Sequence, residues 1–319
     1  MRYLLYFIIA SLFSIKGESQ QTENTYLSVD NYVSALGDLK DKNVASIADT
    51  LTQLFESKEN KARAIFCWIA NNIALDPKTA RSNDNKNTDP VIVIQTRKTS
   101  PIGFATLFQE MASTANIRCL IVNGYSKNST ENINTIEDEP NHSWNVVQLG
   151  TSPNEWYYVD AAKASGNLDN KKTVFTKIFK PEYFFSNKYI FNQDHYPQNK
   201  SWLLGEGPKS LKEFYALPLI EKGAYQFGVV KINPSTGYIT TKINTAFKFN
   251  FQLNNNNTIS NVEVVFGEGA KETKPERINF LANGNELSFS YKFKKEDTFP
   301  FRIIVNGINF ISYLIETSE

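Results

Sequence analysis

The chain has 319 residues, with 34 Lys and Arg against 33 Asp and Glu and a formal net charge of +1. This balance gives no basic surplus for a phosphate backbone, so nucleic-acid binding is not expected. Two Cys and two His are too few for a zinc finger, an all-Cys iron–sulfur site or a disulfide-dense small fold. The length predicts two domains, and a cysteine nucleophile would have to be Cys67 or Cys119.

The N-terminus carries a basic start, Met1-Arg2, an apolar run over Tyr3–Phe13 and then small and polar residues. This order is typical of a secretory signal peptide, which we expect over residues 1–19. The apolar run is shorter than the roughly 20 residues of a membrane span. We therefore expect a secreted or periplasmic protein with no membrane span in the mature chain.

Three helices are predicted next. Apolar residues recur at helical spacing over Asp38–Glu59 and more strongly over Lys61–Ile73, and a charged, Asn-rich loop follows over Arg81–Asp89. Ser100-Pro101 predicts the start of a third helix over Ile102–Ala115. There the serine would cap free N–H groups and the proline would suit the first helical position.

Strands are predicted after these helices. Ile117–Tyr125 is rich in β-branched residues, while His142–Leu149 and Trp156–Asp160 form a hairpin around Gly150–Asn154. Helices followed by an antiparallel sheet give an α+β arrangement.

The second half of the chain has a different character. Pro181–Glu221 is rich in aromatic residues and is expected to pack on a domain. After about residue 220, short strands alternate with Asn, Gly and Pro turns, and Phe247–Leu253 alternates apolar and polar residues. This pattern predicts a C-terminal β-sandwich.

His142 and Asp160 are candidate catalytic residues. His142 opens one strand of the hairpin and Asp160 closes the other, so their side chains are expected roughly 5 Å apart. A carboxylate there would orient the imidazole and raise its pKa. With a nucleophile at a facing helix start, this would be the arrangement of a Cys-His-Asp triad.

The motif order resembles the transglutaminase-like superfamily, which has a papain-like fold. The resemblance rests on Lys61–Ile69, Gly103-Phe104-Ala105, Val122–Lys127, His142–Asn145 and Trp156–Asp160. It spans about residues 40–166, and Tyr183–Phe185, Asp194–Pro197, Ser201–Leu204 and Leu211–Leu217 extend it toward the kyphoscoliosis-peptidase-like and cytokinesis-protein-like subgroup. In that subgroup an immunoglobulin-like β-domain follows.

The resemblance implies a fold class and domain plan. We expect a papain-like transglutaminase core of helices packed on an antiparallel sheet, followed by an immunoglobulin-like β-sandwich. The predicted parts are a transglutaminase-like domain over residues 20–190, a connecting segment over 191–223 and the β-sandwich over 224–319.

The resemblance breaks at the nucleophile. The family cysteine lies two residues before the glycine of the Gly-Tyr-Ala element, and here that position is Pro101. The family glycine before it is Thr99, and a tryptophan downstream of the aspartate has become Lys163. His142 and Asp160 align with the family histidine and aspartate, so they are interpreted as the remnant of a triad.

Other residues could replace the missing thiol. Ser100 lies one residue early and is explained as a helix cap, while Cys67 and Cys119 read as small buried apolar residues. A Cys67–Cys119 disulfide stays open. His195 is interpreted as a capping or packing residue, and no metal and no cofactor are expected.

Two functions stay open. One is a non-catalytic exported protein that binds a protein, peptide or cell-wall ligand, with Trp144, Ser100 and Lys163 as candidate binding residues in the old groove. The other is a peptidase or acyl transferase that uses a displaced nucleophile with His142 and Asp160. Pro101 favours the first, because covalent catalysis needs a nucleophile within hydrogen-bond reach of its base.

Overall fold

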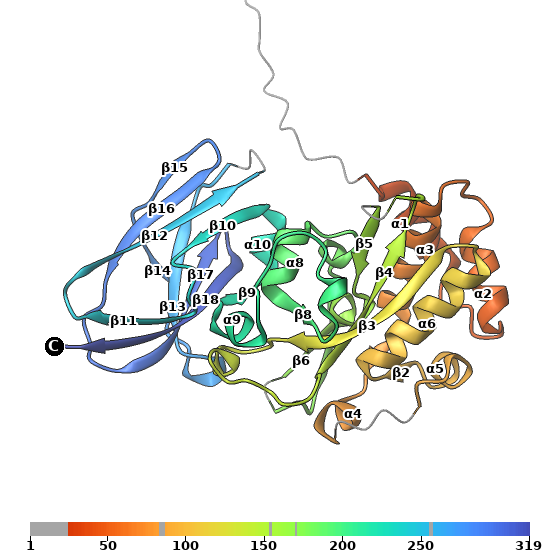
Figure 1. Cartoon of the computed structure of the whole chain (residues 1–319), viewed down its shortest axis with the longest axis horizontal. Coiled ribbons are helices and arrows are strands. Elements are labelled where there is room, and N and C mark those ends of the chain that lie inside the picture. The colour runs from red at the N-terminus through yellow and green to blue at the C-terminus, as the bar shows by residue number, and fades with distance from the viewer. Residues whose placement is uncertain (1–24, 83–86, 153–154, 170, 255–257) are drawn as a thin grey trace, which may run out of the picture.

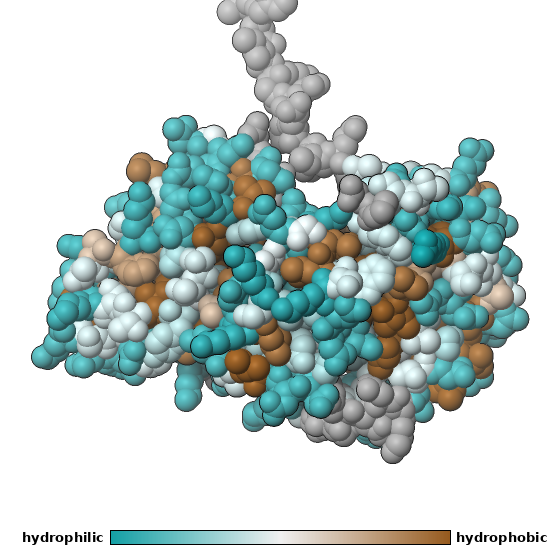
Figure 2. Space-filling model, viewed as in Figure 1, coloured by the Kyte–Doolittle hydropathy of each residue, from teal (hydrophilic) through white to brown (hydrophobic). Residues whose placement is uncertain are grey.

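A computed structural model describes residues 25–82, 87–152, 155–169, 171–254 and 258–319. The predicted signal peptide, residues 1–19, lies outside these ranges. A part with helices and a four-stranded sheet lies beside a β-rich part along the long axis of the molecule (Figure 1). Most of the surface in Figure 2 is polar, with apolar residues in small scattered groups. None of the helices in the described residues is long and apolar enough to span a bilayer.

Helices form one layer of the first part. The side chains of Asn43 and Ser57 accept hydrogen bonds from Ser46 N and Asn60 N, so each side chain caps the N-terminus of a helix. The helices expected over 38–59 and 61–73 are present with shifted ends, because these caps fix their starts. A short helix that was not predicted starts after Asp89. The helices are α1 (Leu27–Leu36), α2 (Val44–Thr52), α3 (Lys58–Asn72), α4 (Pro77–Ser82), α5 (Pro90–Thr96) and α6 (Pro101–Thr114).

An antiparallel sheet forms the second layer, and the predicted hairpin is confirmed. Its strand order is β5-β4-β3-β8, from β3 (Arg118–Ser126), β4 (His142–Gln148), β5 (Trp156–Val159) and β8 (His195–Pro197). Helix α6 packs on β3 and β4. A core that includes Phe66, Trp68, Phe108 and Val146 fills the space between the layers. Two pairs of short strands complete this part, β1 (Ala74–Leu75) with β2 (Lys98–Thr99) and β6 (Gly166–Leu168) with β7 (Phe175–Lys177).

The connecting segment packs against both parts. Strand β8 joins the first sheet beside β3, whereas β9 (Leu219–Ile220) pairs with the last strand of the chain. The predicted boundaries at 190 and 223 fall inside α8 and α10. The remaining helices of the molecule are α7 (Ala161–Ser165), α8 (Lys188–Asp194), α9 (Leu211–Ala216) and α10 (Lys222–Gln226). Short 3-10 turns lie at Thr130–Asn132, Pro181–Tyr183, Lys200–Trp202 and Gly269–Lys271.

Two sheets make up the β-rich part. One has the order β10-β12-β16-β15, from β10 (Val229–Asn233), β12 (Ala246–Leu253), β16 (Glu286–Lys292) and β15 (Leu281–Asn283). The other joins β11 (Tyr238–Lys242), β18 (Ile308–Ser318), β17 (Thr298–Val305), β13 (Val262–Phe266) and β14 (Glu276–Arg277).

Side chains of both sheets share one apolar core. The alternation predicted over 247–253 is confirmed, since Phe249, Phe251 and Leu253 are buried in this core. Phe301 and Tyr313 of the second sheet lie 5.5 and 5.4 Å from the Phe249 ring, measured between ring centroids. The immunoglobulin-like character of this part stays a prediction.

Candidate functional site

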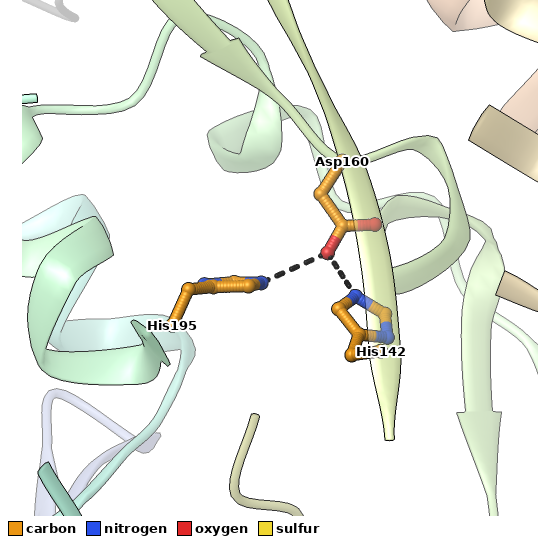
Figure 3. A group of neighbouring side chains, drawn as sticks. All are labelled: His142, Asp160 and His195. Carbon is orange, nitrogen blue, oxygen red and sulfur yellow. Dashed lines mark hydrogen bonds and ion pairs between the residues drawn. The ribbon is translucent and has the colours of Figure 1, made fainter. Parts of the chain in front are cut away.

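The site is built where the hairpin meets helix α7. His142 begins β4, and Asp160 directly follows β5 as the N-cap of α7. Asp160 Oδ1 accepts a hydrogen bond from Lys163 N at 2.8 Å, and Oδ2 lies 2.6 Å from His142 Nε2 (Figure 3). The register pairs Asn145 with Val159, so Asp160 lies just beyond the ladder and reaches His142 through its side chain. The two predicted side chains therefore converge.

His195 joins this pair, although it was interpreted as a capping or packing residue. Its Nε2 lies 3.0 Å from the same Asp160 Oδ2, and its imidazole is fully buried. The ring stacks on Phe191 with centroids 3.8 Å apart. The pairing of Ser126 with His195 brings β8 to this place. A contact between strands so distant in sequence leaves no local signal, and the Asp194-His195-Tyr196-Pro197 motif was the only available hint.

The site holds an ionised carboxylate between imidazoles. Burial on its own would raise the pKa of Asp160, but electrostatic attraction and hydrogen bonds from His142 and His195 outweigh burial and hold it well below its usual value. Burial lowers the pKa of His195, and the carboxylates of Asp194 and Asp160 only partly oppose this. His195 is therefore neutral at pH 7 and Asp160 is charged.

A second buried carboxylate lies behind His195. Asp194 accepts hydrogen bonds from Lys163 Nζ at 2.8 Å, Tyr225 Oη at 3.0 Å and Tyr183 Oη at 3.2 Å. Burial would raise the pKa of Asp194, but the ammonium group of Lys163 and the nearby His195 bring it below its usual value. Lys163, expected as a binding residue, is thus the ion-pair partner of Asp194, with 13% of its side chain exposed.

The nucleophile position lies at the start of α6. Pro101 is the first residue of this helix, which packs on β4, the strand that begins with His142. Asn145 Nδ2 donates to Ala105 O at 3.0 Å and ties the strand to the helix. Position 101 therefore carries a proline side chain, which is neither ionisable nor nucleophilic.

Ser100 does not cap the helix as expected. Its backbone carbonyl accepts the first helical hydrogen bond, from Phe104 N at 3.1 Å. Its side chain caps no N–H group, and its buried Oγ has no hydrogen-bond partner among the residues that the structure describes. The helix start is therefore fixed by the proline and by backbone geometry alone.

Trp144 and Ser100 were also candidate binding residues. They are 1% and 3% exposed. The Trp144 indole packs edge-on against His195 and Phe191, with ring centroids 5.1 and 6.0 Å apart. Trp144 thus forms a wall behind the imidazoles, and contact of either side chain with a ligand would require a rearrangement.

Both cysteines are free, buried thiols, so the open question of a disulfide is answered. Cys67 lies in α3 and Cys119 in β3, away from the start of α6. Burial raises the pKa of each thiol to about 12. Both thiols are therefore protonated at pH 7, and a protonated thiol is a poor nucleophile.

Part of the chain matches a known protein family. The sequence profile of the transglutaminase-like superfamily matches residues 45–161, which include α2 to α6, the hairpin and Asp160. Residues 45–161 of the chain thus form a transglutaminase-like domain.

The chain is also similar in sequence to several individual proteins. The chain is 32% identical to kyphoscoliosis peptidase of Mus musculus over 196 residues. These aligned residues cover 61% of this chain and 29% of that protein. It is 24% identical to hillarin of Drosophila melanogaster over 185 residues, which cover 53% of this chain and 22% of hillarin. It is 27% identical to cytokinesis protein 3 of Schizosaccharomyces pombe over 173 residues, which cover 52% of this chain and 18% of that protein. The chain spans less than a third of the length of each of these relatives.

Proposed function

We propose that the chain is an exported, catalytically inactive member of the superfamily, which acts by binding a protein, peptide or cell-wall ligand. Pro101 at the start of α6 carries this proposal. A proline side chain cannot attack a carbonyl, and covalent catalysis needs a nucleophile within about 3 Å of its base. The buried, protonated state of both cysteines supports it, because neither can take over the role.

A peptide-like ligand follows from the class of protein. A domain that retains its fold after losing a nucleophile keeps the surfaces that recognised the substrate, because catalytic and binding contacts come from different residues. One relative is named a peptidase, which favours polypeptide over other ligands. Fluorescence anisotropy with labelled glutamine-containing peptides and co-sedimentation with purified peptidoglycan test this. Saturable binding to either is expected, and failure to bind both would contradict it.

The second candidate function is residual enzyme activity. The intact His142–Asp160 pair, at 2.6 Å, favours it, because a remnant with no role has no need of this geometry. A peptidase or acyl-transfer assay with peptide and amine-donor substrates separates the two. The first proposal predicts no turnover above that of the His142→Ala variant.

Export is proposed from the signal-like residues 1–19. Expression in a bacterial host that secretes proteins, followed by fractionation and N-terminal sequencing, tests it. We expect the protein outside the cytoplasm with an N-terminus near residue 20. A full-length chain in the cytoplasm would contradict export and leave the binding function untouched.

A further inference from the structure

We propose that His142, Asp160 and His195 form a site for a divalent transition-metal ion of the zinc class. Two imidazole nitrogens and a carboxylate oxygen, one from each residue, lie within 4.8 Å of one another. The three residues come from separate elements, β4, the β5–α7 junction and β8, and their polar atoms meet at one point (Figure 3). Two imidazoles and one carboxylate are a ligand set that zinc takes at its three-ligand protein sites.

The distances allow an ion to enter with small movements. His142 Nε2 and His195 Nε2 lie 2.6 and 3.0 Å from Asp160 Oδ2. Tetrahedral zinc with bonds of about 2.1 Å needs ligand atoms about 3.4 Å apart. Each of these two contacts therefore has to open by less than about 1 Å, and the two imidazole nitrogens, which lie within 4.8 Å of each other, have to settle at about 3.4 Å. Rotation of the His142 and Asp160 side chains can supply such movements.

A buried atom without a partner points to the same ion. When His195 donates its Nε2 proton to Asp160, its Nδ1 carries a lone pair. That Nδ1 atom has no hydrogen-bond partner among the described residues and lies 3.6 Å from Asp194 Oδ2, so a lone pair faces a buried anion. An ion on Nε2 moves the proton to Nδ1, where it points at Asp194. This is the carboxylate–histidine–metal arrangement seen at protein metal sites.

The surroundings suit a cation. Two buried carboxyl groups, those of Asp160 and Asp194, lie beside a single ammonium group, that of Lys163, which contacts Asp194 at 2.8 Å. Lys163 N donates a hydrogen bond to Asp160 Oδ1, so the other oxygen, Oδ2, faces the imidazoles. The His142 side chain is 9% exposed, so the site reaches solvent at this imidazole.

Metal titration of the full, untagged chain tests the proposal. After treatment with EDTA and its removal, the protein is titrated with Zn²⁺ by calorimetry and with Co²⁺ by visible absorption. We expect one equivalent of either ion per chain and the ligand-field bands of a four- or five-coordinate Co²⁺ site. Because the chain has only two His, both in this site, proton NMR of the wild type gives a second readout: Zn²⁺ should shift both sets of imidazole signals.

Variants assign the binding to this site. His195→Ala is expected to abolish the one-equivalent binding, while the Cys67→Ala, Cys119→Ala double variant keeps it, because both thiols lie elsewhere. Absence of stoichiometric binding, unshifted imidazole signals, or binding lost with the thiols would overturn the proposal. Since the NMR readout uses the wild type, it stands even if His195→Ala does not fold. None of these readouts depends on turnover or peptide binding, so the proposed function is tested apart from them.

Discussion

At the scale of single residues, the proposed function depends on position 101. We predict that Pro101→Cys creates a reactive thiol, because a thiol at a helix start near an imidazole has a lowered pKa. Alkylation at pH 7, followed by mass spectrometry, should label this variant about tenfold faster than Ile102→Cys, which shares the helix start but lies one residue on. The native cysteines are buried and should stay unlabelled.

The contribution of the His142 imidazole to the reactivity of this thiol can be separated from the contribution of the helix start. Adding His142→Ala to the Pro101→Cys chain should return the labelling rate to that of Ile102→Cys. If Pro101→Cys reacts no faster than Ile102→Cys, position 101 does not face His142, and the alignment of this chain with the family nucleophile is mistaken.

Lys127 is a buried cation whose pKa predicts a pH effect on stability. Its Nζ donates to Phe214 O at 2.8 Å and to Leu217 O at 3.0 Å. Burial lowers its pKa to about 7, opposed in part by Asp194. Between pH 7 and the unfolded pKa of about 10.4, the unfolded chain binds more protons than the folded chain, so the free energy of unfolding rises with pH.

The measurement is a difference between two proteins. Urea unfolding of the wild type and of Lys127→Met at pH 7, 8 and 9 should show a wild-type free energy that rises by up to about 1.4 kcal/mol per pH unit relative to the variant. Taking the difference cancels the other titrating groups. A flat difference would show that Lys127 keeps its usual pKa in the folded protein.

At the scale of elements, helix α3 depends on a lysine from a distant strand. Its last turn has no basic residue of its own. Lys177 of β7 donates instead to Asn71 O at 2.8 Å, Ile73 O at 3.1 Å and Ala70 O at 3.2 Å. A cation there satisfies free carbonyls and complements the helix dipole.

Lys177→Met is therefore expected to lower the free energy of unfolding by about 1 kcal/mol. The control is Lys171→Met, an exposed lysine in the turn before the same strand, which should change it little. Chemical denaturation measures both, and equal effects of the two variants would refute the capping role.

The same scale shows what the sequence can predict. The apolar spacing of α3 and the Ser100-Pro101 start of α6 are local signals, so these helices were predictable. The hairpin that joins His142 to Asp160 was also predictable, because its turn is short. The positions of His195 and Lys163 in the site were not predictable. They depend on the β3–β8 pairing and on the ion pair to Asp194, which arise from packing between distant segments.

At the scale of the whole molecule, the main apolar cores of the two parts are connected through buried contacts. Ile190 of α8 lies in the core of the β-rich part, and β9 pairs with β18. Tyr225 of α10 donates to Asp194 behind the site. Such contacts couple the unfolding of the two parts, because neither can open without exposing surface of the other.

We therefore predict one cooperative transition. All four Trp (Trp68, Trp144, Trp156 and Trp202) lie before the β-rich part, so their fluorescence reports the first part, while far-UV circular dichroism reports both. The two signals should change at the same urea concentration. Two separate midpoints would show that the parts unfold independently.

The central claim is that this transglutaminase-like domain has no nucleophile, and covalent probing of the wild-type chain tests it most directly. The native protein is incubated at pH 7 with iodoacetamide and, separately, with a fluorophosphonate, and its intact mass is measured. We predict an unchanged mass with both reagents, because Pro101 cannot react and both thiols are buried and protonated. A stoichiometric adduct that disappears in His142→Ala would contradict the claim and identify an active enzyme.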